Sequence, residues 1–173
     1  MDDFTEMTWL FLLKRKPEAF NCFQVFKELN ENEIDMKIKC LRYDNGGEFV
    51  SNEFNNYCDE NGIKIHLFVT ETPQQNGVLE RKNRAVMEME RTMLNESRLS
   101  NMFWPQAFHI VVHIMNRSFL GNNNDKKPYQ LWKGRQASIK HFIIFGSKCY
   151  IKRIDKNMGK LDFRADEGIL VGY

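Results

Sequence analysis

Two carboxylates stand where metal-assisted chemistry on a phosphodiester is feasible. Asp44 follows the alternating segment KIKCLRY and opens a D-N-G-G turn, and Glu80 lies in the first turn of a predicted long helix, with 35 residues between them. A carboxylate after a strand and another at a helix start can converge at the carboxyl edge of an α/β sheet, where ligand sites are favoured. Carboxylate oxygens bind Mg²⁺, and two bound ions activate a nucleophile and stabilise the leaving oxygen of a phosphodiester.

The predicted helix from Gly77 to Glu96 separates charged from apolar side chains. At about 100° per residue, Glu80, Arg84 and Arg91 fall within about 40° of one another. The opposite arc is apolar except for Lys82, which projects into it, and contains Val78, Leu79, Ala85, Val86, Met89 and Met93. An acid beside two arginines suits a metal ligand next to a surface that binds phosphates. The alternative is an ordinary i,i+4 Glu-Arg ion pair on the surface.

The elements that must position these residues predict an α/β domain, because strands and helices alternate. We expect, in order, a buried strand at 8–13, a helix at 17–30, a strand at 37–43, a short helix capped by Ser51 and stopped by Gly62, a strand at 63–68, a polar loop at 69–76, helices at 77–96 and 104–116, and a helical turn at 128–132. After Ser138 the segments HFIIFG, KCYIKRI and GILVGY are β-like. We therefore predict two domains, 1–136 and 137–173.

Composition narrows the class of protein. The 173 residues suffice for one domain with a sizeable core and a small appendage. The sequence has no run of 18 apolar residues, so it predicts no membrane-spanning helix. The N-terminus lacks the pattern of a secretory signal. The 4 cysteines form no C-x-x-C pair and fit neither a zinc site nor a disulfide framework. We expect reduced thiols in an intracellular protein of the nucleus or cytoplasm.

Charge is unevenly distributed along the chain. Residues 1–60 contain 7 basic and 13 acidic residues, a net of −6, and residues 61–173 contain 18 basic and 10 acidic residues, a net of +8. A basic half indicates a polyanionic partner such as DNA. An ordinary solvated surface is the alternative.

Two motifs closely resemble the second and third acidic motifs of copia-type retrotransposon integrases: LRYDNGGEF at 41–49 and TPQQNGVLERKNR at 72–84. The 35-residue spacing between the acids also resembles that family. Further similar segments are DDFTEMTWLFLLK at 2–14, FWPQAFHIVVHIMNR at 103–117, PYQLWKGR at 128–135 and most of the tail. Nearly the whole chain is covered.

The resemblance implies a ribonuclease-H-like mixed sheet flanked by helices, followed by the start of a small β-barrel at 137–173. It implies that Asp44 and Glu80 bind Mg²⁺ or Mn²⁺ as the second and third acids of a triad in DNA integration, a polynucleotidyl transfer. The first acid would precede the DDF segment, so we expect a truncated core that lacks its first strand and is inactive as given. Asp2 and Asp3 then correspond to a turn. DNA and a second copy of the chain are the expected partners.

Two other classes of function stay open: an inactive or domesticated module that only binds DNA or protein, and a stand-alone ribonuclease-H-type nuclease. His109 and His113 have the i,i+4 spacing of metal ligands but lack the glutamate of H-E-x-x-H, so we interpret both as helix-packing residues. Phe103 and Trp104 suit packing better than base stacking. Glu48 is a secondary metal candidate for which a turn role is the better interpretation.

Overall fold

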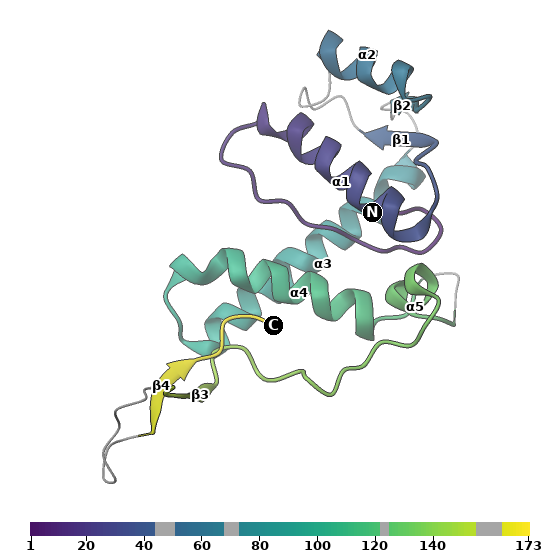
Figure 1. The fold of residues 1–173 in the computed structure, drawn as a ribbon. Helices are drawn as coiled ribbons and strands as arrows, with labels where there is room; N and C mark the ends of the chain where they lie inside the picture. Colours follow the sequence, from purple (N-terminus) through teal and green to yellow (C-terminus); the bar gives the residue numbers. More distant parts are fainter. Residues whose placement is uncertain (44–50, 68–72, 122–124, 155–163) are drawn as a thin grey trace. The chain divides into compact units, whose positions relative to one another are not determined.

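The computed structural model describes residues 1–43, 51–67, 73–121, 125–154 and 164–173 (Figure 1). Its elements are α1 (Glu18–Ile34), β1 (Cys40–Tyr43), α2 (Asn52–Glu60), β2 (Lys64–Leu67), α3 (Pro73–Ser97), the short 3₁₀ helix η1 (Asn101–Phe103), α4 (Trp104–Ser118), α5 (Pro128–Lys133), β3 (Lys148–Lys152) and β4 (Ala165–Ile169). They form two compact units: unit 1 comprises Met1–Leu10 and Arg84–Tyr173, and unit 2 comprises Phe11–Asn83. The predicted boundary at residue 136 stays a prediction.

Unit 2 is built on a parallel pair of strands. β1 pairs with β2 in a register that sets Cys40 opposite Lys64 and Tyr43 opposite Leu67. The core of the unit combines side chains from α1, α2 and the residue preceding β2: Phe23, Phe54, Cys58 and Ile63. Phe20, Tyr43 and Tyr57 are among the aromatic residues that pack around it. The α/β character predicted for this region is therefore confirmed.

The residues that flank α1 and α2 explain where these helices begin and end. Pro17 precedes α1 with a helical φ of −60°, and Asp35 ends that helix in the left-handed region at φ 53°. The Ser51 hydroxyl accepts the backbone N–H of Phe54 at 3.1 Å and caps α2 as predicted. Gly62, at φ 67°, follows α2 in a conformation that glycine adopts without strain, so the predicted stop is also confirmed.

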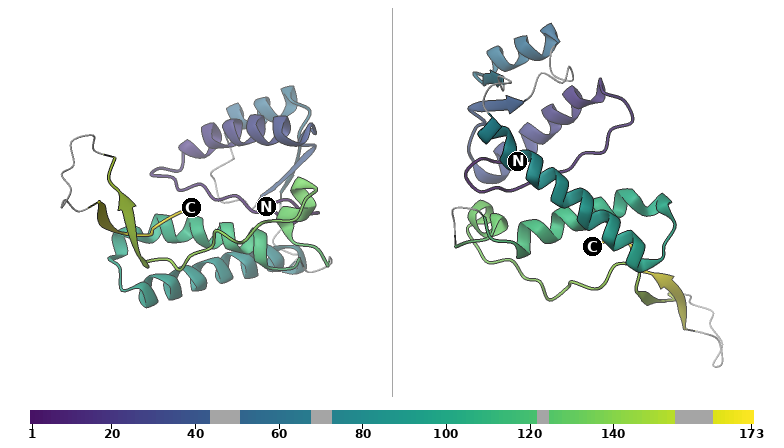
Figure 2. Two further views of the ribbon diagram at one scale, coloured as in Figure 1. Left: turned by 60° about the horizontal axis from the view of Figure 1, so that its bottom comes forward. Right: turned by 180° about the vertical axis from the view of Figure 1, so that it is seen from behind.

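Unit 1 contains two apolar clusters between α3 and α4, which lie side by side (Figure 2). The first cluster contains Val86, Val111, Val112 and Met115. The second contains Leu94, Ala107, Ile110 and Phe145. Because both helices contribute at helical spacing, the apolar arc predicted for the long helix is confirmed at its buried member, Val86.

The segment 8–13 is not a strand, and the prediction of a buried strand there is wrong. The side-chain amide of Asn116 takes both backbone groups of Thr8: Oδ1 accepts the Thr8 N–H at 3.0 Å, and Nδ2 donates to the Thr8 carbonyl at 2.7 Å. Asn116 therefore makes the pair of bonds that a neighbouring strand would make. Phe11, Leu12 and Leu13 are exposed, so the apolar run is not a buried strand either.

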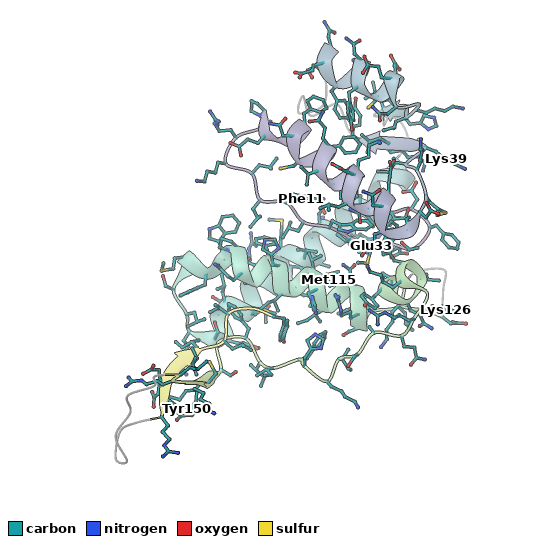
Figure 3. All side chains as sticks on the ribbon, viewed as in Figure 1. Phe11, Glu33, Lys39, Met115, Lys126 and Tyr150 are labelled. Atoms are coloured by element: carbon teal, nitrogen blue, oxygen red, sulfur yellow. The ribbon has the colours of Figure 1, made fainter. Side chains whose placement is uncertain are left out.

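The end of the chain forms an antiparallel hairpin. β3 pairs with β4 so that Lys148 faces Ile169 and Lys152 faces Ala165. Tyr150 of β3 is exposed (Figure 3). The β-like segment 141–146 is not a strand. It ends at Gly146, at φ 78°, whose N–H donates to the Leu170 carbonyl at 2.8 Å, and that conformation turns the chain instead of extending a strand.

No helix within the described ranges has the length and apolar character that crossing a membrane requires. All four cysteines are free thiols, and Cys58 is fully buried.

Candidate active site

The parallel strands of unit 2 bring the chain to the position of the first candidate ligand. β1 ends at Tyr43, the residue before Asp44, and β2 ends opposite it at Leu67. Tyr43 is fixed by its ring, which lies edge-on to Phe54 with centroids 6.0 Å apart. Burial, with a smaller contribution from Cys58, raises the pKa of the Tyr43 hydroxyl. Asp44 itself lies outside the described residues, as does Glu48.

Glu80 lies on α3, but further into the helix than predicted. The helix begins at Pro73, so the predicted loop at 69–76 is wrong for 73–76, and Glu80 falls in the third turn instead of the first. The physical reason is that proline is favoured in the first helical turn, where its missing N–H would have no helical partner. Gly77 is then an interior helix residue, which costs about 1 kcal/mol relative to alanine without ending the helix.

The exposure predicted for the charged face is confirmed: Glu80, Arg84 and Arg91 are all exposed. Glu80 belongs to unit 2, and the two arginines lie further along α3 in unit 1. No ion pair joins Glu80 to another described residue. The interpretation of Glu80 as half of a surface ion pair therefore has no support in the described part of the chain.

The donor chemistry of Glu80 fits a hard divalent cation, because such ions prefer oxygen ligands and Glu80 is an exposed carboxylate. No group of three or more His, Cys, Asp or Glu side chains within the described ranges lies together as a metal site. Asp44, the other predicted ligand, lies outside those ranges.

A third basic group near Glu80 was missed by the sequence analysis. The Arg81 guanidinium folds back along α3, and its Nη1 lies 3.2 Å from the point that a Cβ on Gly77 would occupy. The signal was available in the sequence as a glycine four residues before an arginine in one helix.

The remaining sequence candidates have structural roles or lie apart from the carboxylates. Asp2 accepts the Thr5 N–H at 2.8 Å and the Thr5 hydroxyl at 2.7 Å, which confirms its turn role. Phe103 packs against the second cluster of unit 1 as expected. Trp104 is 44% exposed and stacks edge-on with Phe108 at 5.8 Å.

The two histidines of α4 differ from each other. His113 is half-buried against the ring of Phe142, at 5.6 Å between centroids, as a packing residue should be. His109 is exposed, so the packing interpretation is wrong for that residue. The i,i+4 spacing of His109 and His113 is that of a metal-binding pair. In the structure, however, His113 contacts His141, whose Nε2 lies 3.2 Å from the His113 Nε2.

Comparison with known proteins identifies relatives along the whole chain. It is 36% identical over 173 residues to the retrovirus-related Pol polyprotein from transposon TNT 1-94 of Nicotiana tabacum. It is 34% identical over 173 residues to the corresponding polyprotein from transposon RE2 of Arabidopsis thaliana. The chain spans 13% and 12% of the lengths of these relatives. No family model matches the chain.

Solved structures share the fold at low sequence identity. A chain of the simian T-cell lymphotropic virus intasome matches 97% of this chain and 59% of its own length, with a TM-score of 0.61 and 17% identity. The HTLV-2 integrase catalytic core domain in complex with magnesium, in its trimeric form, matches 75% of this chain and 78% of its own length, with a TM-score of 0.56 and 19% identity. The chain is thus similar along its whole length to a segment of the retrovirus-related Pol polyproteins of transposons, and it has the fold of a retroviral integrase core.

Proposed function

We propose that the chain is the core portion of a copia-type integrase, a polynucleotidyl transferase that joins element DNA to target DNA. The observation that carries this proposal is the 36% identity to a transposon Pol polyprotein over all 173 residues. The retroviral-integrase fold supports it. So does the end of β1 at Tyr43, directly before Asp44, beside the carboxyl end of the parallel strand β2.

In this proposal Asp44 and Glu80 hold Mg²⁺ or Mn²⁺, and a solved neighbour of the chain is described as being in complex with magnesium. Such ions, when bound, supply nucleophile activation and neutralise charge at the leaving oxygen. The nucleophile is water when element ends are processed and a DNA 3′-hydroxyl when they are joined. Its oxygen bonds to phosphorus while the bond from phosphorus to the leaving 3′-oxygen breaks. Arg84 and Arg91 bind the flanking phosphates.

The catalytic proposal predicts a requirement for an additional acid. A polypeptide of these 173 residues alone contributes two of the three acids that the family resemblance implies, and we expect it to be inactive in strand transfer. A Pol polypeptide extended upstream through an Asp-bearing strand should join a pre-processed DNA end in Mn²⁺. Asp44→Asn or Glu80→Gln should abolish that activity.

Glu88→Gln is the matched control, because Glu88 is another exposed acid on α3. It should keep the activity of the extended polypeptide. Joining by the 173-residue polypeptide alone, or by the Glu80→Gln variant of the extended one, would contradict the assignment. An extended polypeptide that binds DNA but never joins ends would favour a module that only binds DNA.

DNA binding forms the second part of the proposal. We expect affinity that is independent of sequence and falls steeply with salt, because bound phosphates release counterions. Arg84→Ala with Arg91→Ala should weaken binding equally for unrelated duplexes. It should also reduce the slope of log affinity against log salt by about 2, which is close to 0.9 per lost phosphate contact. Fluorescence anisotropy across a salt series measures both effects.

Lys126→Ala with Lys140→Ala is the control for net charge, since it removes two exposed positive charges from unit 1 outside α3. If this control and the arginine variant lose affinity equally, the effect is general charge and α3 is not the binding surface.

The same proposal includes features that follow from the family resemblance. Residues 137–173 are proposed as the start of a small β-barrel, which the β3–β4 hairpin supports. A homo-oligomer is proposed because solved neighbours are described as trimeric and dimeric forms. An intracellular location, in the nucleus or cytoplasm, is proposed on the four free thiols.

A further inference from the structure

Two imidazole rings from distant parts of unit 1 meet edge to edge. His113 is on α4, and His141 lies in the segment between α5 and β3, 28 residues later. Their Nε2 atoms are 3.2 Å apart. The ring centroids are 5.5 Å apart and the rings are inclined at 84°. The centroid separation is close to the longest that this contact allows, so the two ring nitrogens face each other nearly head-on.

An aromatic frame holds this geometry. The rings of Phe142 and Tyr173 stack at 5.4 Å with 16° between their planes. Each lies 5.0–5.6 Å from both imidazoles. The Tyr173 hydroxyl accepts the Ile143 N–H at 3.0 Å and donates to the Ile143 carbonyl at 2.6 Å. The last residue of the chain thereby fixes the segment that carries His141.

The separation of the two nitrogens suits shared coordination. Zinc binds histidine nitrogen at about 2.0–2.1 Å, so two nitrogens on a tetrahedral ion lie about 3.3–3.4 Å apart. The observed 3.2 Å is close to that value. A shared ion also needs the two rings to tilt from their head-on arrangement, so that both lone pairs point at it. A direct N–H···N bond between the rings has a similar length, but it needs a proton where coordination needs two lone pairs. The two arrangements are therefore separable by adding a metal ion.

The surroundings of His113 disfavour its protonated form. Burial lowers the pKa of His113 to about 4, with smaller electrostatic contributions from Arg117 and His141 in the same direction. The Arg117 guanidinium donates to the His113 carbonyl at 3.3 Å and lies over the Tyr129 ring at 4.4 Å. Tyr173 also packs against both rings of the pair.

We propose that His113 and His141 form a two-imidazole site for a divalent transition-metal ion of the zinc, nickel and copper class. Imidazole nitrogen prefers these ions to Mg²⁺, so the site is separate in chemistry from the carboxylates Asp44 and Glu80. No third His, Cys, Asp or Glu in the described ranges completes a cluster with them. Occupancy would join the segment around His141 and Tyr173 to α4.

The test is a titration of the 173-residue chain with Zn²⁺ or Ni²⁺ at pH 7.5 against a chromogenic chelator. We expect one equivalent to bind, with affinity at least tenfold lower in His141→Ala. His141 is exposed, so this change should leave the fold intact, which circular dichroism checks. His109→Ala is the matched control, because His109 is an exposed histidine one turn before His113 on the same helix. It should bind like the unmodified chain.

Imidazole proton NMR provides a second measurement that does not depend on variants. Of the four histidines, His113 and His141 should shift on adding Zn²⁺, whereas His66 and His109 should not. Equal affinity in His141→Ala and the unmodified chain would overturn the proposal. Shifts confined to His66 or His109, or no binding of either ion at millimolar concentration, would overturn it as well.

Discussion

At the scale of single residues, Phe54 organises unit 2. It is fully buried, and its ring lies edge-on to Phe20 at 5.6 Å and to Phe23 at 5.5 Å. Tyr43, the residue before Asp44, also packs on it. The side chain therefore connects α1, α2 and β1, and it supports the strand end that leads to the candidate site.

Phe54→Ala should destabilise the chain by about 3–5 kcal/mol, since it removes a buried aromatic ring and leaves a cavity. Phe4→Ala is the control, because Phe4 is 72% exposed and its loss should change stability by less than about 0.5 kcal/mol. Urea denaturation followed by circular dichroism measures both. Equal midpoints for the two variants would show that Phe54 is not part of a packed core.

Two glycines show how the same residue type serves different elements. Gly77 is an interior residue of α3, where the described atoms near the missing Cβ belong to the end of the Arg81 side chain. Gly146 has φ 78°, and a Cβ there would lie 2.5 Å from the Ser97 Cβ. The first position tolerates a side chain, because the tip of an arginine moves easily. The second tolerates none, because both the backbone conformation and the space exclude it.

Gly77→Ala should therefore be neutral or stabilise the chain by up to about 1 kcal/mol, the difference in helix propensity. Gly146→Ala should destabilise it by about 1–3 kcal/mol through backbone strain, with overpacking against Ser97 adding to the loss. Thermal unfolding of the two variants side by side gives the comparison. A Gly146→Ala protein as stable as Gly77→Ala would contradict the packing described between Gly146 and α3.

The elements that were predicted are those with local signals. α1, α2 and α4 follow apolar periodicity and caps, so their bounds were predicted to within a few residues. The structure of the run TWLFLL could not be predicted from its own residues. An apolar run forms a strand only if its backbone N–H and C=O groups bond to another strand, and here a distant side chain, that of Asn116, bonds to those of Thr8 instead. The start of α3 was not predicted, because proline and glycine usually interrupt helices. Pro73 is tolerated here because it lies in the first turn, and Gly77 is tolerated inside the helix at a modest cost.

The candidate site residues were also predictable only where the signal was local. Exposure of Glu80, Arg84 and Arg91 follows from helical spacing and was predictable. The approach of His141 to His113 was not, because 28 residues and a segment without regular structure separate the two rings. Sequence spacing places residues on one face of one element, and contacts between elements depend on packing.

At the scale of the whole molecule, charge follows the two units. Unit 1 contains 15 basic and 11 acidic residues, a net of +4, and unit 2 contains 10 basic and 12 acidic residues, a net of −2. The proposed phosphate-binding arginines lie in the positive unit, and the proposed metal-binding carboxylates lie in the negative one. This division is the one expected if one unit holds the DNA backbone and the other holds cations.

The pairing of Asn116 with Thr8 joins residues 108 positions apart and has a consequence for amide hydrogen exchange. Thr8 lies in no helix or strand, yet its N–H is bonded to a side chain that is 97% buried. Hydrogen exchange at the Thr8 amide requires its hydrogen bond to Asn116 to break. The exchange rate of this amide should therefore be as low as the rates of amides in α4. In Asn116→Ala, the Thr8 amide should exchange at the rate of an open loop while amides near the start of α4 stay protected. An exchange map of this protein would therefore record strand-like protection at a residue that has no neighbouring strand.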